Sequence, residues 1–124
     1  MAPPMIALQA DRQHGLTTAL LDVALANARR GQSVTFWSPT ASQSHHSFRT
    51  AVRLVLDEAI DMQAAVLATN GREAMRFPRG GVVRFVWGYA GRHAEADVRI
   101  VDAEGPEGEA AIVRPRAEVR NAGR

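Results

Sequence analysis

The chain has no cysteine among its 124 residues and no lysine, since all 15 of its basic residues are arginine. Without cysteine, neither disulfides nor thiolate metal sites are available, and the four histidines show no metal-binding spacing. The sequence also shows no charged-then-apolar leader and no apolar run of about 18 residues. We therefore expect a protein that is neither exported nor inserted into a membrane, and that stays in the cytoplasm.

What the chain does contain is enough apolar material for one core. With 46% hydrophobic and 23% charged residues, its composition is typical of a single folded domain spanning 1–124. The formal net charge of +2 permits nucleic acid binding without requiring it. Residues 105–124 are rich in Gly, Glu, Ala and Arg, so we expect a partly flexible tail with one candidate strand at 111–114.

The first part of the chain predicts a strand, a helix and a second strand. Residues 5–10 form a short apolar run, residues 16–30 place apolar side chains at helical spacing, and residues 33–37 are β-branched and aromatic. Such a βαβ unit has parallel strands, and ligands bind at the carboxyl ends of those strands. The loops at 10–15 and 38–42 should then lie on one functional edge.

The second part predicts a helix, a hairpin and a further strand. Apolar residues from Phe48 to Ile60 follow the i, i+3, i+4, i+7 spacing of an amphipathic helix. Period-two alternation at 75–77 and 82–87, around a turn at 78–81, predicts a β-hairpin. The apolar residues of 97–102 predict another strand.

Residues 10–18 follow the outline of a phosphate loop, G-x-x-x-x-G-K-[S/T]. In that loop, backbone N–H groups cradle the phosphates, the lysine reaches the outer phosphates and the hydroxyl binds magnesium. Here Gly15 and Thr17 match, but Leu16 occupies the lysine position. The degenerate loop consists of Ala10, Arg12, Gln13, His14, Gly15, Leu16, Thr17 and Thr18.

A purely structural interpretation of this loop is also open. Gly15 would then be a turn residue, Thr17 and Thr18 would start a helix, and Leu16 would be a core contact. On that interpretation the sequence indicates only an α/β domain.

The order of four segments resembles the ATPase domain at the N-terminus of phage terminase large subunits, the motors that package DNA into capsids. Residues 11–18 resemble the terminase phosphate loop, and residues 34–49 resemble its second strand and Thr-x-x-Gln region, with Thr40 and Gln43 in place. Residues 70–85 resemble the hairpin before the second motif, and 91–102 resemble an Arg-Gly segment followed by the acid strand.

This resemblance covers residues 5 to about 104. It implies a three-layer P-loop NTPase-like fold of the RecA and terminase kind, with a mainly parallel sheet flanked by helices and a β-hairpin.

The chain departs from the family at the two positions that the chemistry needs most. The leucine side chain at position 16 can neither carry charge nor donate a hydrogen bond to a phosphate. In the family, a first carboxylate holds magnesium through water and a second polarises the attacking water. Asp102 matches the first, Ala103 occupies the second, and Glu104 lies one residue late, where a strand points its side chain to the other side. The resemblance therefore implies that Thr17 and Asp102 are vestigial metal ligands.

These departures favour a pseudo-ATPase, a phage or prophage accessory protein in the host cytoplasm that keeps the fold as a binding or interaction module. It would have no catalytic residues and no cofactor, and its partner would be a phage or host ATPase or another copy of the chain. The alternative is a residual nucleotide-binding protein or weak ATPase that binds ATP and magnesium weakly, with Arg12 standing in for the lysine.

A second hypothesis is DNA binding by an arginine-rich hairpin. Six arginines and three acids lie between positions 72 and 99, and Phe85, Trp87 and Tyr89 would share a strand face on which bases could stack. A mildly basic surface with a core aromatic stripe is the competing interpretation. The candidate DNA-binding residues are Thr40, Gln43, Arg49, Arg72, Arg76, Arg79, Arg84 and Arg92.

Overall fold

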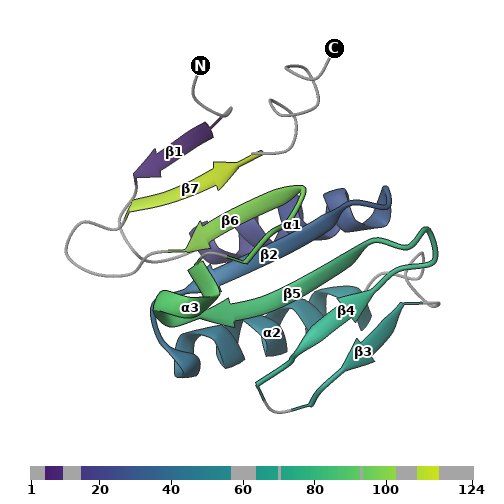
Figure 1. Cartoon of the computed structure of the whole chain (residues 1–124). Coiled ribbons are helices and arrows are strands. Elements are labelled where there is room, and N and C mark those ends of the chain that lie inside the picture. The colour runs from purple at the N-terminus through teal and green to yellow at the C-terminus, as the bar shows by residue number, and fades with distance from the viewer. Residues whose placement is uncertain are drawn as a thin grey trace.

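In a computed structural model of the chain, residues 5–9, 15–56, 64–69, 71–92, 94–102 and 109–114 are described. Helices and strands alternate along much of the chain, as Figure 1 shows. In order they are β1 (Met5–Gln9), α1 (Leu16–Arg29), β2 (Ser33–Ser38), α2 (Ala41–Leu56), β3 (Ala65–Leu67), β4 (Ala74–Arg76), β5 (Val82–Trp87), α3 (Gly88–Arg92), β6 (Val98–Asp102) and β7 (Glu109–Val113).

The strands form one mixed sheet with the order β1-β7-β6-β2-β5-β4-β3. β2 pairs in parallel with β5 and with β6, whereas the other four strand pairs are antiparallel. The α/β class is therefore confirmed, but the expectation of a mainly parallel sheet is wrong. The antiparallel pairs arise because β4 and β3 extend the sheet as hairpins beyond β5, and because β7 enters between β1 and β6.

Five strands nevertheless point the same way, and one of them is β3, which runs parallel to β5 because both are antiparallel to β4. β2, β5 and β6 are mutually parallel, and β1 runs parallel to β6 because both are antiparallel to β7. Their carboxyl ends therefore meet at one edge of the sheet, on the left in Figure 1. We call this side the carboxyl edge.

The core lies between one face of the sheet and the helices α1 and α2. Register places Val34, Val83 and Val98 side by side across three strands, followed by Phe36, Phe85 and Ile100, and all six are buried. Phe48 of α2 packs edge-on against Phe85 at 5.4 Å between ring centroids, and Leu20, Leu21 and Leu25 of α1 belong to the same cluster. Burying a side chain of this size is worth about 1.5–3 kcal/mol, so this interface holds the two helices in place.

The opposite face carries much less cover among the described residues. The five-residue helix α3 lies over it near the carboxyl edge, where Gly91 approaches Val86 and the Trp37 indole Nε1 donates a hydrogen bond to the Gly88 carbonyl at 2.7 Å. Among the described residues, this short helix is the cover on the face opposite α1 and α2, so the three-layer P-loop fold stays a prediction. We call the face that bears Arg76, Val82, Arg84 and Val86 the open face.

Both long helices are confirmed, with shifted ends. α1 ends at Arg29, and Gly31 follows at φ 97°, the left-handed conformation expected of the glycine that stops it. α2 begins at Ala41, seven residues before the start that its apolar pattern predicts, because Thr40 caps it. Positions 57–60 of the predicted helix lie outside the described residues.

The hairpin and the later strands are also present. β4 and β5 pair antiparallel, and β6 matches the strand predicted at 97–102. The prediction that Tyr89 shares a strand face with Phe85 and Trp87 is wrong, because β5 ends at Trp87 and Tyr89 lies on α3 with 84% of its surface exposed. Phe85 is 1% exposed, in agreement with the competing interpretation of a core aromatic. Within the predicted tail, β7 begins at Glu109, two residues before the candidate strand. None of the described helices is both long enough and apolar enough to span a membrane.

Candidate functional site at the carboxyl edge

The phosphate-loop region and the acid strand meet at the carboxyl edge. Gly15 precedes α1 with φ 95°, a left-handed conformation that favours glycine, and its carbonyl accepts the first helical hydrogen bond from Ala19 at 2.8 Å. Asp102 ends β6 on the face that α1 covers. The remaining predicted loop residues, Ala10, Arg12, Gln13 and His14, lie outside the described residues, as do Ala103 and Glu104.

A direct hydrogen bond joins the two motifs. The Thr17 hydroxyl donates to Oδ2 of Asp102 at 2.9 Å, although the two residues are 85 positions apart in the sequence. Asp102 is 5% exposed. A buried carboxylate is costly without hydrogen-bond partners, so this contact stabilises the end of β6 as well as the start of α1.

The pair borders a small polar cavity, which we call the edge pocket. Its volume is about 280 Å³. Its lining comes from α1, α2 and β6 and consists of Thr17, Ser42, Gln43, His46, Ser47 and Asp102. All six side chains can donate or accept hydrogen bonds, so the edge pocket suits a small polar ligand.

Sequence reasoning missed three of these residues, Ser42, His46 and Ser47. Ser42 and His46 are four positions apart on α2, so they share a helix face. The signal was present in Thr40-x-x-Gln43, which marks a helix start just before them. The predicted loop at 38–42 placed Ser42 on the functional edge without singling it out, whereas starting the predicted helix at Phe48 left His46 and Ser47 outside any predicted element.

Leu16 is partly buried and packs against the core cluster at the first position of α1. This arrangement agrees with the structural interpretation of that residue. Toward a magnesium ion, the described part of the site offers the Thr17 hydroxyl and the Asp102 carboxylate. Magnesium is commonly held by one or two carboxylates together with phosphate oxygens and waters, so this pair fits part of such a site. The described residues contain no group of three acids or histidines that could hold a metal ion.

Thr40 and Gln43 have a structural role at the start of α2. The Gln43 backbone N–H donates to the Thr40 hydroxyl at 3.2 Å, and that hydroxyl donates to Oε1 of Gln43 at 3.1 Å. These contacts satisfy helix N-terminal groups that otherwise lack partners. Gln43 also reaches the edge pocket, whereas Thr40 does not line it.

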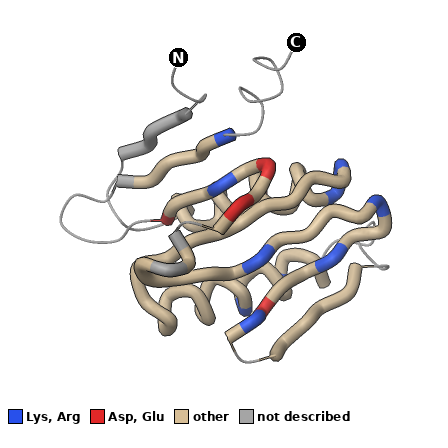
Figure 2. Tube along the Cα trace, viewed as in Figure 1, with Lys and Arg blue, Asp and Glu red and all other residues tan. Residues whose placement is uncertain are grey.

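The predicted DNA-binding arginines separate into groups. Arg72, Arg76 and Arg84 are exposed around a hollow of about 440 Å³ on the open face. Arg79 is exposed in the hairpin turn, and Arg49 is exposed on α2, so neither lines that hollow. Figure 2 shows arginines on β4, on β5 and at the hairpin turn. The side chain of Arg92 lies outside the described residues.

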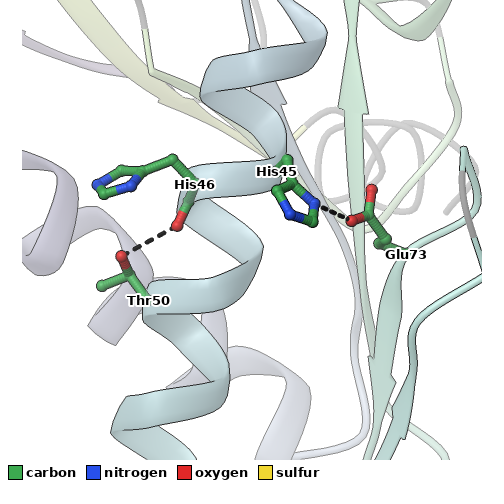
Figure 3. A network of polar contacts seen from close by, with 4 residues as sticks. All are labelled: His45, His46, Thr50 and Glu73. Carbon is green, nitrogen blue, oxygen red and sulfur yellow. Dashed lines mark hydrogen bonds and ion pairs between the residues drawn. The ribbon is translucent and has the colours of Figure 1, made fainter.

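Two adjacent histidines project in different directions from α2, as the helical angle of about 100° between neighbours predicts. His45 points toward Glu73, with Nδ1 2.6 Å from Oε2, while His46 points away from it (Figure 3). The Glu73 side chain is 7% exposed and that of His45 is 57% exposed. This contact ties α2 to the chain just before β4.

Compared with models of known protein families, with curated proteins and with solved structures, the chain matched none.

Proposed function

We propose that the protein is a phage or prophage accessory protein whose terminase-like P-loop fold has lost ATPase chemistry and serves as a binding or interaction module. The observation that carries the proposal is the packing of two residues in the phosphate-loop segment 10–18. Leu16 packs on the core where a phosphate loop needs a lysine, while the neighbouring Thr17 is joined directly to Asp102.

Leu16 leaves the phosphate-loop position without a positive charge. Phosphoryl transfer depends on cationic and hydrogen-bonding groups that stabilise charge developing on the phosphates. Removing one such group commonly costs about 3–4 kcal/mol of transition-state stabilisation. Leu16 replaces one of these groups and Ala103 replaces another, so hydrolysis should be negligible.

Loss of hydrolysis does not imply loss of ligand binding, because the lining of the edge pocket is polar. Thr17, Gln43 and Asp102 can hold a small ligand without catalysing a reaction on it. The last strand in the sheet order, β3, carries Val66 and Leu67 at 41% and 37% exposure. Such an edge is suited to pairing with another copy or with an active ATPase, which supports the interaction part of the proposal.

The test is a pair of measurements on the wild type and on Leu16→Lys. We expect no magnesium-dependent ATP turnover by the wild type and no heat of binding on calorimetric titration with MgATP. Leu16→Lys measures whether the missing cation alone prevents binding, and its thermal denaturation shows whether the variant stays folded.

Two outcomes would count against the proposal. Turnover that disappears in Asp102→Ala would identify a working ATPase, whereas turnover that survives this change would indicate a contaminating enzyme. Binding of MgATP to the wild type without turnover would favour the alternative, a residual nucleotide-binding protein.

A further inference from the structure

The open face contains a hollow that is separate from the edge pocket and shares no lining residue with it. It has a volume of about 440 Å³ and is formed along β3, β4 and β5. Apolar side chains contribute to its lining through Leu67, Val82 and Val86. Exposed arginines surround these apolar residues at positions 72, 76 and 84.

The arginines around the hollow are held by the register of the hairpin. Ala74 pairs with Arg84 and Arg76 pairs with Val82, so Arg76 and Arg84 are diagonal neighbours on one face of the sheet. Diagonal neighbours on antiparallel strands lie about 7–8 Å apart. Two guanidinium groups at this spacing can contact two different phosphates of one chain.

The exposed charge around the hollow is of one sign. Glu73 is the one acid among the described residues that line it, and its buried carboxylate contacts the His45 ring. Neither Arg76 nor Arg84 forms an ion pair with another described residue. The positive charge around the hollow is therefore complementary to a negatively charged chain and not to a positively charged or neutral one.

The shape of the open face favours single-stranded over double-stranded nucleic acid. A duplex is read by a helix or a free two-stranded ribbon that enters its groove. Here β4 and β5 lie inside the sheet between β3 and β2, and α3, the helix on this face of the described structure, has five residues. A shallow basic sheet face with a nearby aromatic ring suits a flexible single strand instead. Tyr89 supplies such a ring, because it is 84% exposed on α3, which packs on Val86 at the border of the hollow.

We propose that the open face binds single-stranded nucleic acid, with Arg72, Arg76 and Arg84 contacting phosphates and Tyr89 stacking on a base. This inference does not depend on the edge pocket or on the loss of ATPase chemistry. The five described arginines of the sequence hypothesis then form two sets, since Arg49 and Arg79 lie away from the hollow and take no part in binding.

The experiment compares two double variants of equal charge. Arg76→Gln with Arg84→Gln removes two groups from the hollow, while Arg49→Gln with Arg79→Gln removes two outside it, and each pair lowers the formal net charge from +2 to 0. Binding is measured by fluorescence anisotropy with a labelled single-stranded DNA, an RNA of the same sequence and the matching DNA duplex, over a range of salt concentrations. Thermal denaturation verifies that each variant is folded.

We expect the wild type to bind single strands more tightly than the duplex, with a dependence of log K on log salt of about −2 for three phosphate contacts. The Arg76 and Arg84 variant should lower that slope by about 1.4 and weaken binding at least tenfold. Tyr89→Ala should weaken binding by about fivefold or more and leave the salt slope unchanged. The Arg49 and Arg79 variant should bind as the wild type does.

Equal losses in the two double variants would mean attraction by net charge alone and would overturn the proposal. Duplex binding as tight as single-strand binding would overturn it as well, and so would the absence of binding by the wild type. A preference for RNA over DNA, or the reverse, would identify which single strand the open face takes.

Discussion

Thr17 and Asp102 show how one hydroxyl can connect two distant parts of the chain. Oδ2 of Asp102 accepts the Thr17 hydroxyl hydrogen at 2.9 Å, and the carboxylate is almost wholly shielded from water. Loss of this donor leaves part of the hydrogen-bonding capacity of a buried charged group unused, which typically costs about 1–3 kcal/mol.

We therefore expect Thr17→Val, which keeps the shape of the side chain, to lower the free energy of unfolding by about 1–3 kcal/mol. Urea denaturation followed by circular dichroism measures the change. The matched control is Thr18→Val, at the next and exposed position of α1, for which a change within about 0.5 kcal/mol is expected. Equal effects of the two substitutions would show that the Asp102 contact contributes nothing to stability.

The same pair shows which residues of the candidate site could be predicted from the sequence. Thr17 and Asp102 are each predicted from a motif, and the structure brings them together. His46 is not predicted at the site, because adjacent histidines on a helix diverge and only the position of α2 decides which one faces Asp102. The packing of Leu16 follows from its apolar side chain, as the structural interpretation of the loop proposed.

Among the elements, the β4–β5 hairpin lies against the end of α1 at Gly81. A Cβ atom built on Gly81 would lie 1.8 Å from the Ala28 carbonyl oxygen. The Gly81 carbonyl also accepts a hydrogen bond from the Phe77 N–H at 2.9 Å, and the next residue, Val82, donates to the Gln32 carbonyl. The turn is thus held against the end of α1 with no space for a side chain.

Gly81→Ala should lower the free energy of unfolding by more than about 2 kcal/mol, because backbone atoms must move apart to admit the methyl group. Gly80→Ala is the control at the neighbouring position, where a Cβ meets nothing within 4 Å but φ is 91°. Its expected loss is about 1–2 kcal/mol from the left-handed backbone alone. Chemical denaturation of both variants gives the order, and a smaller loss for Gly81→Ala than for Gly80→Ala would contradict the close approach.

Elements with a strong local pattern are predictable, and those without one are not. The apolar periodicity of α1, the alternation in β5 and the acid strand β6 are all visible in the sequence. The exposed three-residue strand β3 has no alternation to detect, since all its residues are exposed. The start of α2 depends on the hydrogen bonds between Thr40 and Gln43 and not on its apolar face.

At the level of the whole molecule, β7 is an internal strand of the sheet, between the end strand β1 and β6, and its own sequence does not predict this position. It pairs with β1 on one side and with β6 on the other, and it contributes Ala110 and Ile112 to the core. Local patterning can suggest a strand here but cannot say which strands it joins, because pairing across the sheet is decided by contacts distant in sequence. The antiparallel pairing of β7 with β1 and β6 is one reason why the prediction of a mainly parallel sheet is wrong.

A chain that ends at residue 106 should therefore lose cooperative unfolding, because β1 would have no neighbour and β6 would present an unpaired edge. A chain that ends at residue 118 keeps β7 and should unfold as the full chain does. Thermal denaturation followed by circular dichroism distinguishes the two, and a cooperative transition in the shorter chain would show that β7 is dispensable.

The place of β7 also bears on the order of events on the ribosome. β1 is made early, yet its partner in the sheet is synthesised about a hundred residues later. Until that partner emerges, the first strand has no ladder to join, so the part of the nascent chain between β1 and β7 should remain incompletely folded. Closing such a distant pair is also intrinsically slow, which exposes the growing chain to chaperones and to aggregation before its first strand is paired.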